Sequence, residues 1–223
     1  MNKVIMTGFC QVGSISPAVA IHSFGYHCHG YDEVAYHAAR DGDYGPMLSL
    51  VERYDCLRDW PFSLYCDVIA ERYPDAVFMH VERANPDLWF NNMLPYTNHK
   101  TGLDYAFIFR DWFGRSRLRP QDRQLAVDVY EEHNAYVRKS LGDRLKLVFC
   151  IDNHHRWHEI GKVLGVELCD TLRGPEHDHV LMPFPDPTTR MAWVYNTQTR
   201  YAIYGLDQPM WDHNMLIGEA DDS

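Results

Sequence analysis

Two almost uninterrupted apolar segments constrain the fold of this chain most. They are residues 76–81 and residues 145–151, and a segment with helical spacing follows each of them. Apolar runs without alternation are typical of strands that are covered on both faces. Strands that alternate with helices favour a parallel sheet. We therefore predict an α/β fold with three layers, in which a mostly parallel sheet has helices on both faces.

The rest of the chain extends this alternation of strands and helices. Asp32 is placed to cap a helix over residues 33–40, and Asn85-Pro86 to begin a helix that ends near residue 94. Pro61 is placed to begin another helix. We also predict strands at residues 3–7, 26–29 and 54–57, helices at 14–24, 122–141 and 154–164, a turn at 42–45, an irregular segment at 96–120, and a C-terminal hairpin formed by residues 191–195 and 200–204.

Length, charge and cysteine content restrict the class of protein. The chain has 223 residues and no evident linker or repeat, so we expect a single domain over residues 1–223. Its 21 basic and 31 acidic residues give a net charge of -10, which argues against a nucleic-acid partner. No segment approaches the roughly 20 apolar residues that cross a membrane. Six scattered cysteines without a CxxC pair fit a reducing cytoplasm. The oligomeric state stays open.

Four predicted loops should meet at one edge of the sheet. They begin at Gly8, Asp59, Arg83 and Asp152, and ligands of open parallel sheets bind beyond the carboxyl ends of the strands. The first loop, residues 8–16, carries two glycines and two serines. Such a loop can hold a phosphate with its backbone N–H groups and the following helix N-terminus, or it can simply be a turn and a cap. It lacks the Gly-Lys-Ser/Thr ending that is typical of enzymes that hydrolyse ATP or GTP, which argues against that activity.

The order of several motifs resembles the P-loop-like sulfotransferases, in particular their compact bacterial-type branch. The motifs are Gly8-x-x-x-x-Gly13-Ser14-x-Ser16, Arg58-Asp59-Trp60-Pro61, Tyr73-Pro74-Asp75-Ala76, Val81-Glu82-Arg83 and, farther along, Tyr130-Glu131-Glu132-His133-Asn134 and Pro183-Phe184-Pro185. The resemblance spans residues 3–185 and leaves 186–223 as a C-terminal extension. It implies a P-loop NTPase-like fold. It also implies sulfuryl transfer from 3'-phosphoadenosine 5'-phosphosulfate (PAPS) to a small hydroxyl or amine acceptor.

The resemblance also implies which residues bind the donor. The first loop would surround the 5'-phosphosulfate with Gly8, Cys10, Gln11, Val12, Gly13, Ser14, Ile15 and Ser16. Arg83, together with Asn91 and Asn92, lies where the family holds the 3'-phosphate, and an arginine fork suits a phosphate well. The alternative for Arg83 is a surface ion pair with Glu82 or Asp87.

Two departures from the family pattern bear on activity. Gln11 stands where the family's loop usually carries Arg or Lys, which removes a charge-assisted bond to the transferring group. One extra residue lies between Arg83 and Pro86. Arginines of the irregular segment could replace the missing charge, or they could form a solvated cluster; they are Arg110, Arg115, Arg117 and Arg119. The alternative function is therefore a catalytically degenerate domain that binds a nucleotide, a phosphate or a protein.

Asp59 occupies the position where the family places its base. A carboxylate there could accept the acceptor's proton, but an N-cap for the helix expected at Pro61 is equally compatible with the sequence. His29 and His80 are weaker candidates, and His80 fits a buried core histidine better. The 13 histidines include no HExxH motif, so we expect no metal. Aromatic residues could line the acceptor pocket or fill the core: Trp112, Phe113, Trp193 and Tyr195.

Overall fold

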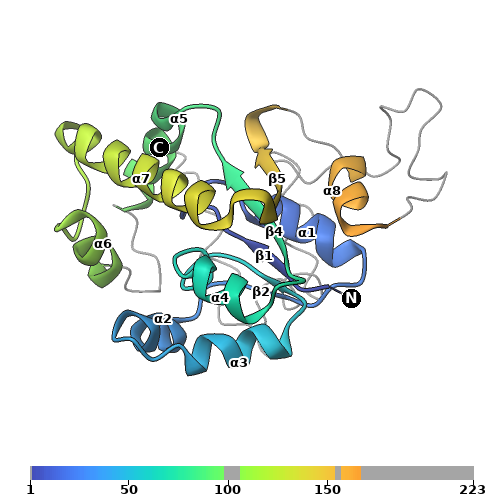
Figure 1. The fold of residues 1–223 in the computed structure, drawn as a ribbon. Helices are drawn as coiled ribbons and strands as arrows, with labels where there is room; N and C mark the ends of the chain where they lie inside the picture. Colours follow the sequence, from blue (N-terminus) through green and yellow to red (C-terminus); the bar gives the residue numbers. More distant parts are fainter. Residues whose placement is uncertain (1, 98–105, 154–156, 167–223) are drawn as a thin grey trace, which may run out of the picture.

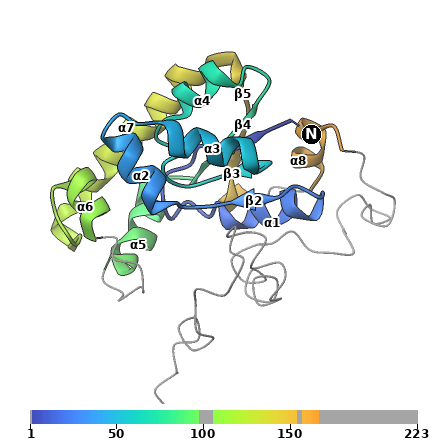
Figure 2. The same cartoon turned by 90° about the horizontal axis from the view of Figure 1, so that it is seen from below.

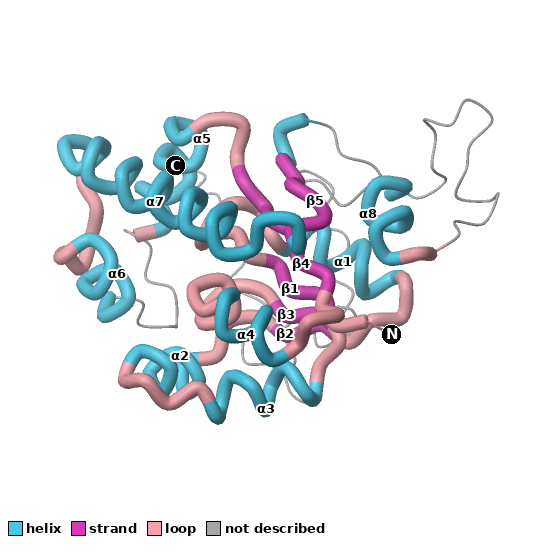
Figure 3. Tube along the Cα trace, viewed as in Figure 1, coloured by secondary structure: helices cyan, strands magenta, loops and turns pink. Residues whose placement is uncertain are grey.

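The computed structural model describes residues 2–97, 106–153 and 157–166. Within them, five parallel strands form one sheet in the order β2-β3-β1-β4-β5 (Figure 3). Helices surround this sheet (Figure 1). The predicted α/β fold with a parallel sheet is thereby confirmed. The hairpin expected between residues 191 and 204 lies outside the described residues.

The elements follow one another as alternating strands and helices. In chain order they are β1 (Val4–Met6), α1 (Ile15–Ser23), β2 (Cys28–His29), α2 (Glu33–Arg40), α3 (Gly45–Arg53), β3 (Cys56–Leu57), α4 (Cys66–Arg72), β4 (Val77–Glu82), α5 (Pro86–Tyr96), α6 (Ala106–Phe113), η1 (Pro120–Asp122), α7 (Arg123–Leu141), η2 (Gly142–Arg144), β5 (Leu145–Cys150), η3 (Ile151–Asn153) and α8 (Trp157–Leu164). The central strand β1 pairs with β3 on one side and with β4 on the other.

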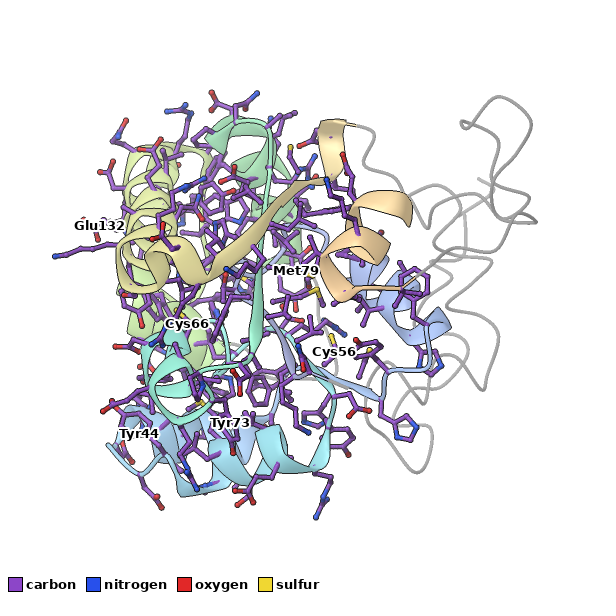
Figure 4. All side chains as sticks on the ribbon, turned by 45° about the vertical axis from the view of Figure 1, so that its right-hand side comes forward. Tyr44, Cys56, Cys66, Tyr73, Met79 and Glu132 are labelled. Carbon is purple, nitrogen blue, oxygen red and sulfur yellow. The ribbon has the colours of Figure 1, made fainter. Side chains whose placement is uncertain are left out.

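The alternation of side chains along the strands divides the core into two clusters. Met6, Cys56 and Met79 belong to the cluster that includes residues of α1 and α8, two helices that lie side by side (Figure 2). Ile5 and Phe78 belong to the second cluster, with residues of α3, α4 and the end of α7. Figure 4 shows Cys56 and Met79 in the interior of the molecule, whereas Glu132 projects outward from α7. Both faces of the sheet are therefore buried along β1 and β4, whereas Lys146 and Val148 of the edge strand β5 are exposed.

Two predicted helix starts have the expected side-chain caps. The Asp32 carboxylate accepts a hydrogen bond from the Ala35 amide at 2.8 Å, at the start of α2. The Asn85 side chain accepts one from the Leu88 amide at 2.9 Å, at the start of α5. These bonds satisfy amides that have no partner within the helix. Both caps are therefore confirmed.

Three helices differ from the sequence predictions. Helix α3 begins at Gly45, where only a turn was expected; Pro46 fits its first turn, and Met47 and Val51 form its buried side. Helix α6 occupies part of the segment that was expected to be irregular. Helix α4 begins at Cys66 rather than at Pro61, because residues 61–64 form a turn first. The structure therefore contradicts those three expectations.

Candidate functional site

The loop between β1 and α1, residues 8–16, lies against the carboxyl end of β4. A Cβ atom on Gly8 would come within 2.5 Å of the Val81 carbonyl oxygen, so only glycine fits there. Gln11 and Gly13 both have left-handed backbone conformations, with φ of 62° and 91°. For Gln11 this conformation is strained, because its Cβ atom crowds the backbone. The loop is thus held in a specific shape that its two glycines favour and that Gln11 does not favour.

Aromatic side chains anchor this loop from inside the protein. Phe9 is fully buried and packs edge-on against Trp60, Trp89 and Trp112, with ring centroids 5.1, 5.8 and 5.5 Å away. The Trp89 indole also donates a hydrogen bond to the Cys10 carbonyl at 2.8 Å. Large aromatic residues supply much buried area, and such edge-to-face pairs add to it. Trp112 is half-buried, packs against the core and does not line the cavity described next.

A cavity of about 280 Å³ opens beside the loop. Its wall contains both polar and aromatic side chains. The lining residues are Cys10, Gln11, Gly13, Ser14, Ile15, Tyr31, Arg58, Asp59, Trp60, Tyr96 and Phe109. Five of the eight loop residues predicted to bind the donor therefore face the same space as Asp59. The other three, Gly8, Val12 and Ser16, are buried behind them.

Asp59 connects the loop to the end of β3. Its carboxylate accepts a hydrogen bond from the Ser14 hydroxyl at 3.4 Å and forms an ion pair with Arg58. Asp59 has a left-handed backbone, with φ of 61°. Helix α4 starts seven residues later, at Cys66, so Asp59 is not the N-cap of that helix. Its side chain is directed to the loop and the cavity instead.

Arg58 is the buried member of this ion pair. Only 2% of the residue is exposed, and its backbone amide donates to the His29 carbonyl at 3.1 Å. A Cβ atom on Gly30 would come within 3.0 Å of Arg58 Nη2, so the guanidinium lies directly against the Gly30 backbone. Arg58 belongs to the motif Arg58-Asp59-Trp60-Pro61, but the motif predicts no role for it. The signal that could have found it is its place just before Asp59, at the end of a strand.

Arg83 lies at the end of β4 and is paired with Asp152, which follows β5. Its Nε and Nη2 atoms donate to the two carboxylate oxygens at 2.8 and 2.7 Å, and the Ala84 amide also donates to this carboxylate at 2.7 Å. Because of the bonds from Arg83, the pKa of Asp152 is lowered from its ordinary value. The partner of Arg83 is therefore neither Glu82 nor Asp87, which pair with Arg138 and Arg123 respectively.

The Arg83–Asp152 pair and the cavity lie at the same edge of the sheet. The loop contacts the carboxyl ends of both strands that carry the pair. Gly8 lies against Val81 of β4, and a Cβ atom on Gly13 would come within 3.0 Å of Ile151, which follows β5. Arg83 is not among the described residues that line the cavity. The two predicted anion-binding places are thus near one loop but do not share one cavity.

The remaining predicted site residues lie on the surface. Asn91 and Asn92 are exposed on α5, whose buried residues are Trp89, Phe90 and Met93. The four arginines proposed to replace the missing loop charge are also exposed: Arg110, Arg115, Arg117 and Arg119. Arg110 donates to the Ala106 carbonyl at 3.2 Å, and Arg115 pairs with Asp122 at 2.9 Å. None of these six side chains lines the cavity in the part of the chain that the structure describes.

Two buried histidines support the start of the loop. His133 Nε2 donates to the Thr7 carbonyl at 2.8 Å, and His80 bonds to the Thr7 hydroxyl and to the Asn134 side chain, both at 3.1 Å. Burial lowers the pKa of His80 and the pKa of His133 to about 4, so both are neutral at pH 7. His80 is thus a core histidine with partners on both ring nitrogens. His29 is also buried, stacks on Tyr54 and does not line the cavity within the described ranges.

Other features add little to the site. Among residues 2–97, 106–153 and 157–166, no cluster of three or more His, Cys, Asp or Glu side chains could hold a metal ion. His154, His177 and His179, as well as Trp193 and Tyr195, lie outside the described residues. None of the described helices has both the length and the apolar character needed to cross a membrane. Burial raises the pKa of the Cys10 thiol well above its ordinary value, so this cysteine stays protonated.

The parallel strand order, with a glycine-bearing loop after the central strand, defines an α/β protein of the P-loop-like class. The family model described as the sulfotransferase domain matches residues 3–105. This match supports the resemblance to sulfotransferases found in the sequence. The match includes the loop, Asp59, Arg83 and both asparagines of α5. A search of curated proteins found no match.

Proposed function

We infer that this protein is an enzyme that transfers a sulfuryl group from PAPS to a small hydroxyl or amine acceptor. The sulfotransferase domain over residues 3–105 supports sulfuryl transfer in general. One observation carries the assignment to this site: the loop after β1 and the carboxylate of Asp59 face the same cavity, and Ser14 bonds directly to Asp59. Donor and acceptor must meet in one place for direct transfer, and this cavity provides that place.

The loop and the start of α1 would hold the 5'-phosphosulfate. Backbone N–H groups of a glycine-bearing loop and of a helix N-terminus favour a negatively charged group. Ser16 adds a specific donor: its hydroxyl is buried and has no hydrogen-bond partner among the described residues. Such a buried polar group costs free energy unless a ligand or water satisfies it. The residues present therefore fit an anionic group at this loop.

Asp59 would act as the base. As the acceptor oxygen or nitrogen forms its bond to sulfur, the Asp59 carboxylate takes the proton that the acceptor loses. The bond between sulfur and the bridging phosphate oxygen breaks at the same time, and its electron pair stays on the departing 3'-phosphoadenosine 5'-phosphate. The Ser14 hydroxyl at 3.4 Å and the Arg58 guanidinium orient the carboxylate for this step. A base within hydrogen-bond reach of the reacting proton meets the geometric requirement for general base catalysis.

Arg83, with Asn91 and Asn92, would hold the 3'-phosphate. The pair with Asp152 already presents a bidentate arginine fork and the Ala84 amide to a carboxylate. A phosphate can accept the same set of hydrogen bonds. The 3'-phosphate would then take the place of Asp152 in the fork, and the exposed asparagines of α5 would complete the site.

We also propose that residues 1–223 form one domain and that the protein works in the cytoplasm. Four cysteines of the described ranges are free thiols: Cys10, Cys28, Cys56 and Cys66. Free thiols persist in reducing compartments, where disulfides are rare.

Ligand binding and turnover test the proposal in sequence. First, 3'-phosphoadenosine 5'-phosphate should raise the midpoint of thermal unfolding, because a ligand that binds only the folded state stabilises it. Adenosine 5'-phosphate, which lacks the 3'-phosphate, is the matched control and should have a smaller effect. Labelled PAPS is then offered with a mixed panel of hydroxyl and amine acceptors, and transfer of the label is measured. No stabilisation by the doubly phosphorylated nucleotide would overturn the donor assignment. Stabilisation without transfer to any acceptor would indicate the alternative, a domain that binds the nucleotide without catalysis.

A further inference from the structure

The loop after β1 lacks a basic side chain, yet a positively charged side chain lines the cavity beside it. Gln11 holds the loop position where the family usually has Arg or Lys, and its amide carries no charge. Of the described residues that line the cavity, Arg58 is the one with a cationic side chain. Arg58 does not belong to the loop: it lies at the end of β3, next to Asp59. The positive charge at this cavity therefore comes from a second strand.

The position of Arg58 is closely determined by its surroundings. The residue is 2% exposed, the guanidinium lies against the Gly30 backbone, and one of its nitrogens pairs with Asp59. A buried charge is costly without a partner, and removing one member of such a pair leaves the other uncompensated. Asp59 keeps the pair neutral overall while it is ionised. A change in the charge of Asp59 therefore changes the net charge at the cavity wall.

We propose that Arg58 supplies the positive charge for sulfuryl transfer that the loop does not supply. This inference rests on the function proposed above. When the acceptor oxygen bonds to sulfur, its proton passes to Asp59, and the pair of Arg58 and Asp59 changes from neutral to a net charge of about +1. At the same moment the bond from sulfur to the bridging phosphate oxygen breaks, and negative charge gathers on that oxygen. The guanidinium then stabilises this charge.

This arrangement favours the transition state over the bound substrates. Before transfer, Asp59 neutralises Arg58, so the donor gains little from it. During transfer, the attraction becomes stronger because Asp59 has taken a proton. Only interactions that strengthen in the transition state accelerate the chemical step. An electrostatic contribution of this kind is large in a site that excludes water, and Arg58 is almost completely buried.

The other arginines considered for this role are less suitable. Arg83 gives its fork to Asp152 and does not line the cavity within the described residues. Arg110 is exposed and donates to its own helix, and Arg115 pairs with Asp122. Arg58 combines burial, a place on the cavity wall and direct contact with Asp59.

Relocation of the charge is the experiment that tests this proposal. In Arg58→Gln, kcat should fall about 10²–10³-fold, as it does when one donor to the developing charge is removed. Adding Gln11→Arg to this variant returns a cation to the loop and should restore kcat by about tenfold or more. Gln11→Arg alone should change kcat by a smaller factor than it does in the Arg58→Gln background, because Arg58 already supplies the charge. Arg110→Gln is the matched control and should leave kcat unchanged, since that guanidinium lies outside the described cavity wall.

Folding of each variant is verified by circular dichroism and by its thermal midpoint. If Arg58→Gln does not fold, Arg58→Lys takes its place: kcat should still fall, and Gln11→Arg should again restore it. A folded Arg58 variant with unchanged kcat would overturn the proposal. So would a folded double variant without recovery, because Arg58 would then only orient Asp59. Failure of the wild-type protein to bind 3'-phosphoadenosine 5'-phosphate is a different result, which overturns the proposed function itself.

Discussion

The Arg58–Asp59 pair and the Arg83–Asp152 pair each consist of an arginine and an aspartate, and both lie at the same edge of the sheet. Arg58 and Asp59 are neighbours in sequence. Asp59 has a left-handed backbone conformation, with φ of 61°, and its side chain faces a cavity. Arg83 and Asp152 come from two strands, β4 and β5, and are joined by two hydrogen bonds of 2.8 and 2.7 Å. The Ala84 amide adds a third bond to Asp152.

The difference lies in what each pair leaves available. Asp59 faces a cavity that a ligand can enter, and its strained backbone is of the kind that clusters at functional sites. In the second pair each carboxylate oxygen of Asp152 accepts a bond from Arg83, so an anion must replace Asp152 before it can reach the fork. We therefore expect the first pair to control turnover and the second pair to control nucleotide affinity. The predictions below separate these two roles.

The largest effect is expected from Asp59→Asn. The amide cannot accept the acceptor's proton, so turnover with PAPS should fall about 10²–10⁴-fold. Stabilisation by 3'-phosphoadenosine 5'-phosphate should persist, because that nucleotide does not need a base to bind. Asp152→Asn is the matched control at the other pair and should retain turnover at saturating donor. Full turnover by Asp59→Asn would show that Asp59 is not the base.

Arg83→Ala should weaken nucleotide binding. Loss of the fork should raise the Kd of 3'-phosphoadenosine 5'-phosphate about 10–100-fold, since hydrogen bonds to charged groups contribute about 1.5–3 kcal/mol. Adenosine 5'-phosphate has no 3'-phosphate and should bind the variant and the wild type alike. Isothermal titration calorimetry with both nucleotides measures the difference. An equal Kd of the doubly phosphorylated nucleotide for both proteins would make Arg83 a purely structural partner of Asp152.

Asp152→Asn should have the opposite effect on the same equilibrium. The amide competes less well for the Arg83 fork and does not repel the 3'-phosphate, so the nucleotide should bind up to about tenfold more tightly. The same titration measures this gain. A double variant with Arg83→Ala provides the control: without the fork, the substitution at Asp152 should bring a smaller gain, because only the repulsion is relieved. Weaker binding by Asp152→Asn would mean that the carboxylate helps to form the nucleotide site rather than to block it.

The pH dependence of stability should also reveal the second pair. The pKa of Asp152 is lowered in the folded protein, chiefly by the hydrogen bonds from Arg83. The unfolded chain therefore binds a proton at higher pH than the folded one, so the pair stabilises the fold above the ordinary pKa of a carboxyl group. This stabilisation should vanish as the pH falls through the lowered value. Urea unfolding should show that the wild type has a larger free energy of unfolding than Asp152→Asn at neutral pH, and that this difference becomes smaller at acidic pH. A difference that stays constant would contradict this linkage.

Features that depend on local sequence could be predicted well. The apolar runs that became β4 and β5, and the caps Asp32 and Asn85, depend on residues that are close together in the chain. Helix α3 was missed because Gly42, Gly45 and Pro46 favour a turn when taken alone. Its buried side, Met47 and Val51, is only stabilised by packing in the second core cluster. Tertiary contacts therefore decided where the local signal was ambiguous.

The site could be predicted only as far as its motifs. The order of the loop, Asp59 and Arg83 along the chain was sufficient to place all three at one edge of the sheet. The partner of Arg83 was missed because Asp152 lies 69 residues away and is brought near by the pairing of β4 with β5. The burial of Arg58 was missed too, since it depends on the close approach of the Gly30 backbone. Contacts between residues on different strands cannot be predicted from the spacing of residues within one segment.

The smallest effect concerns the backbone strain in the loop beside the first pair. Gln11 has φ of 62°, a conformation that costs a residue with a Cβ atom about 1–2 kcal/mol and costs glycine little. Gln11→Gly should therefore be more stable than Gln11→Ala by about 0.5–1 kcal/mol, once the greater freedom of glycine in the unfolded chain is subtracted. The two variants lose the same amide, so their difference in free energy of unfolding, measured with urea, isolates the backbone effect. If the Gln11→Ala variant proves as stable as the Gln11→Gly variant, the loop relaxes when the glutamine is removed. The strain in the loop beside Asp59 would then be caused by the Gln11 side chain rather than by the fold.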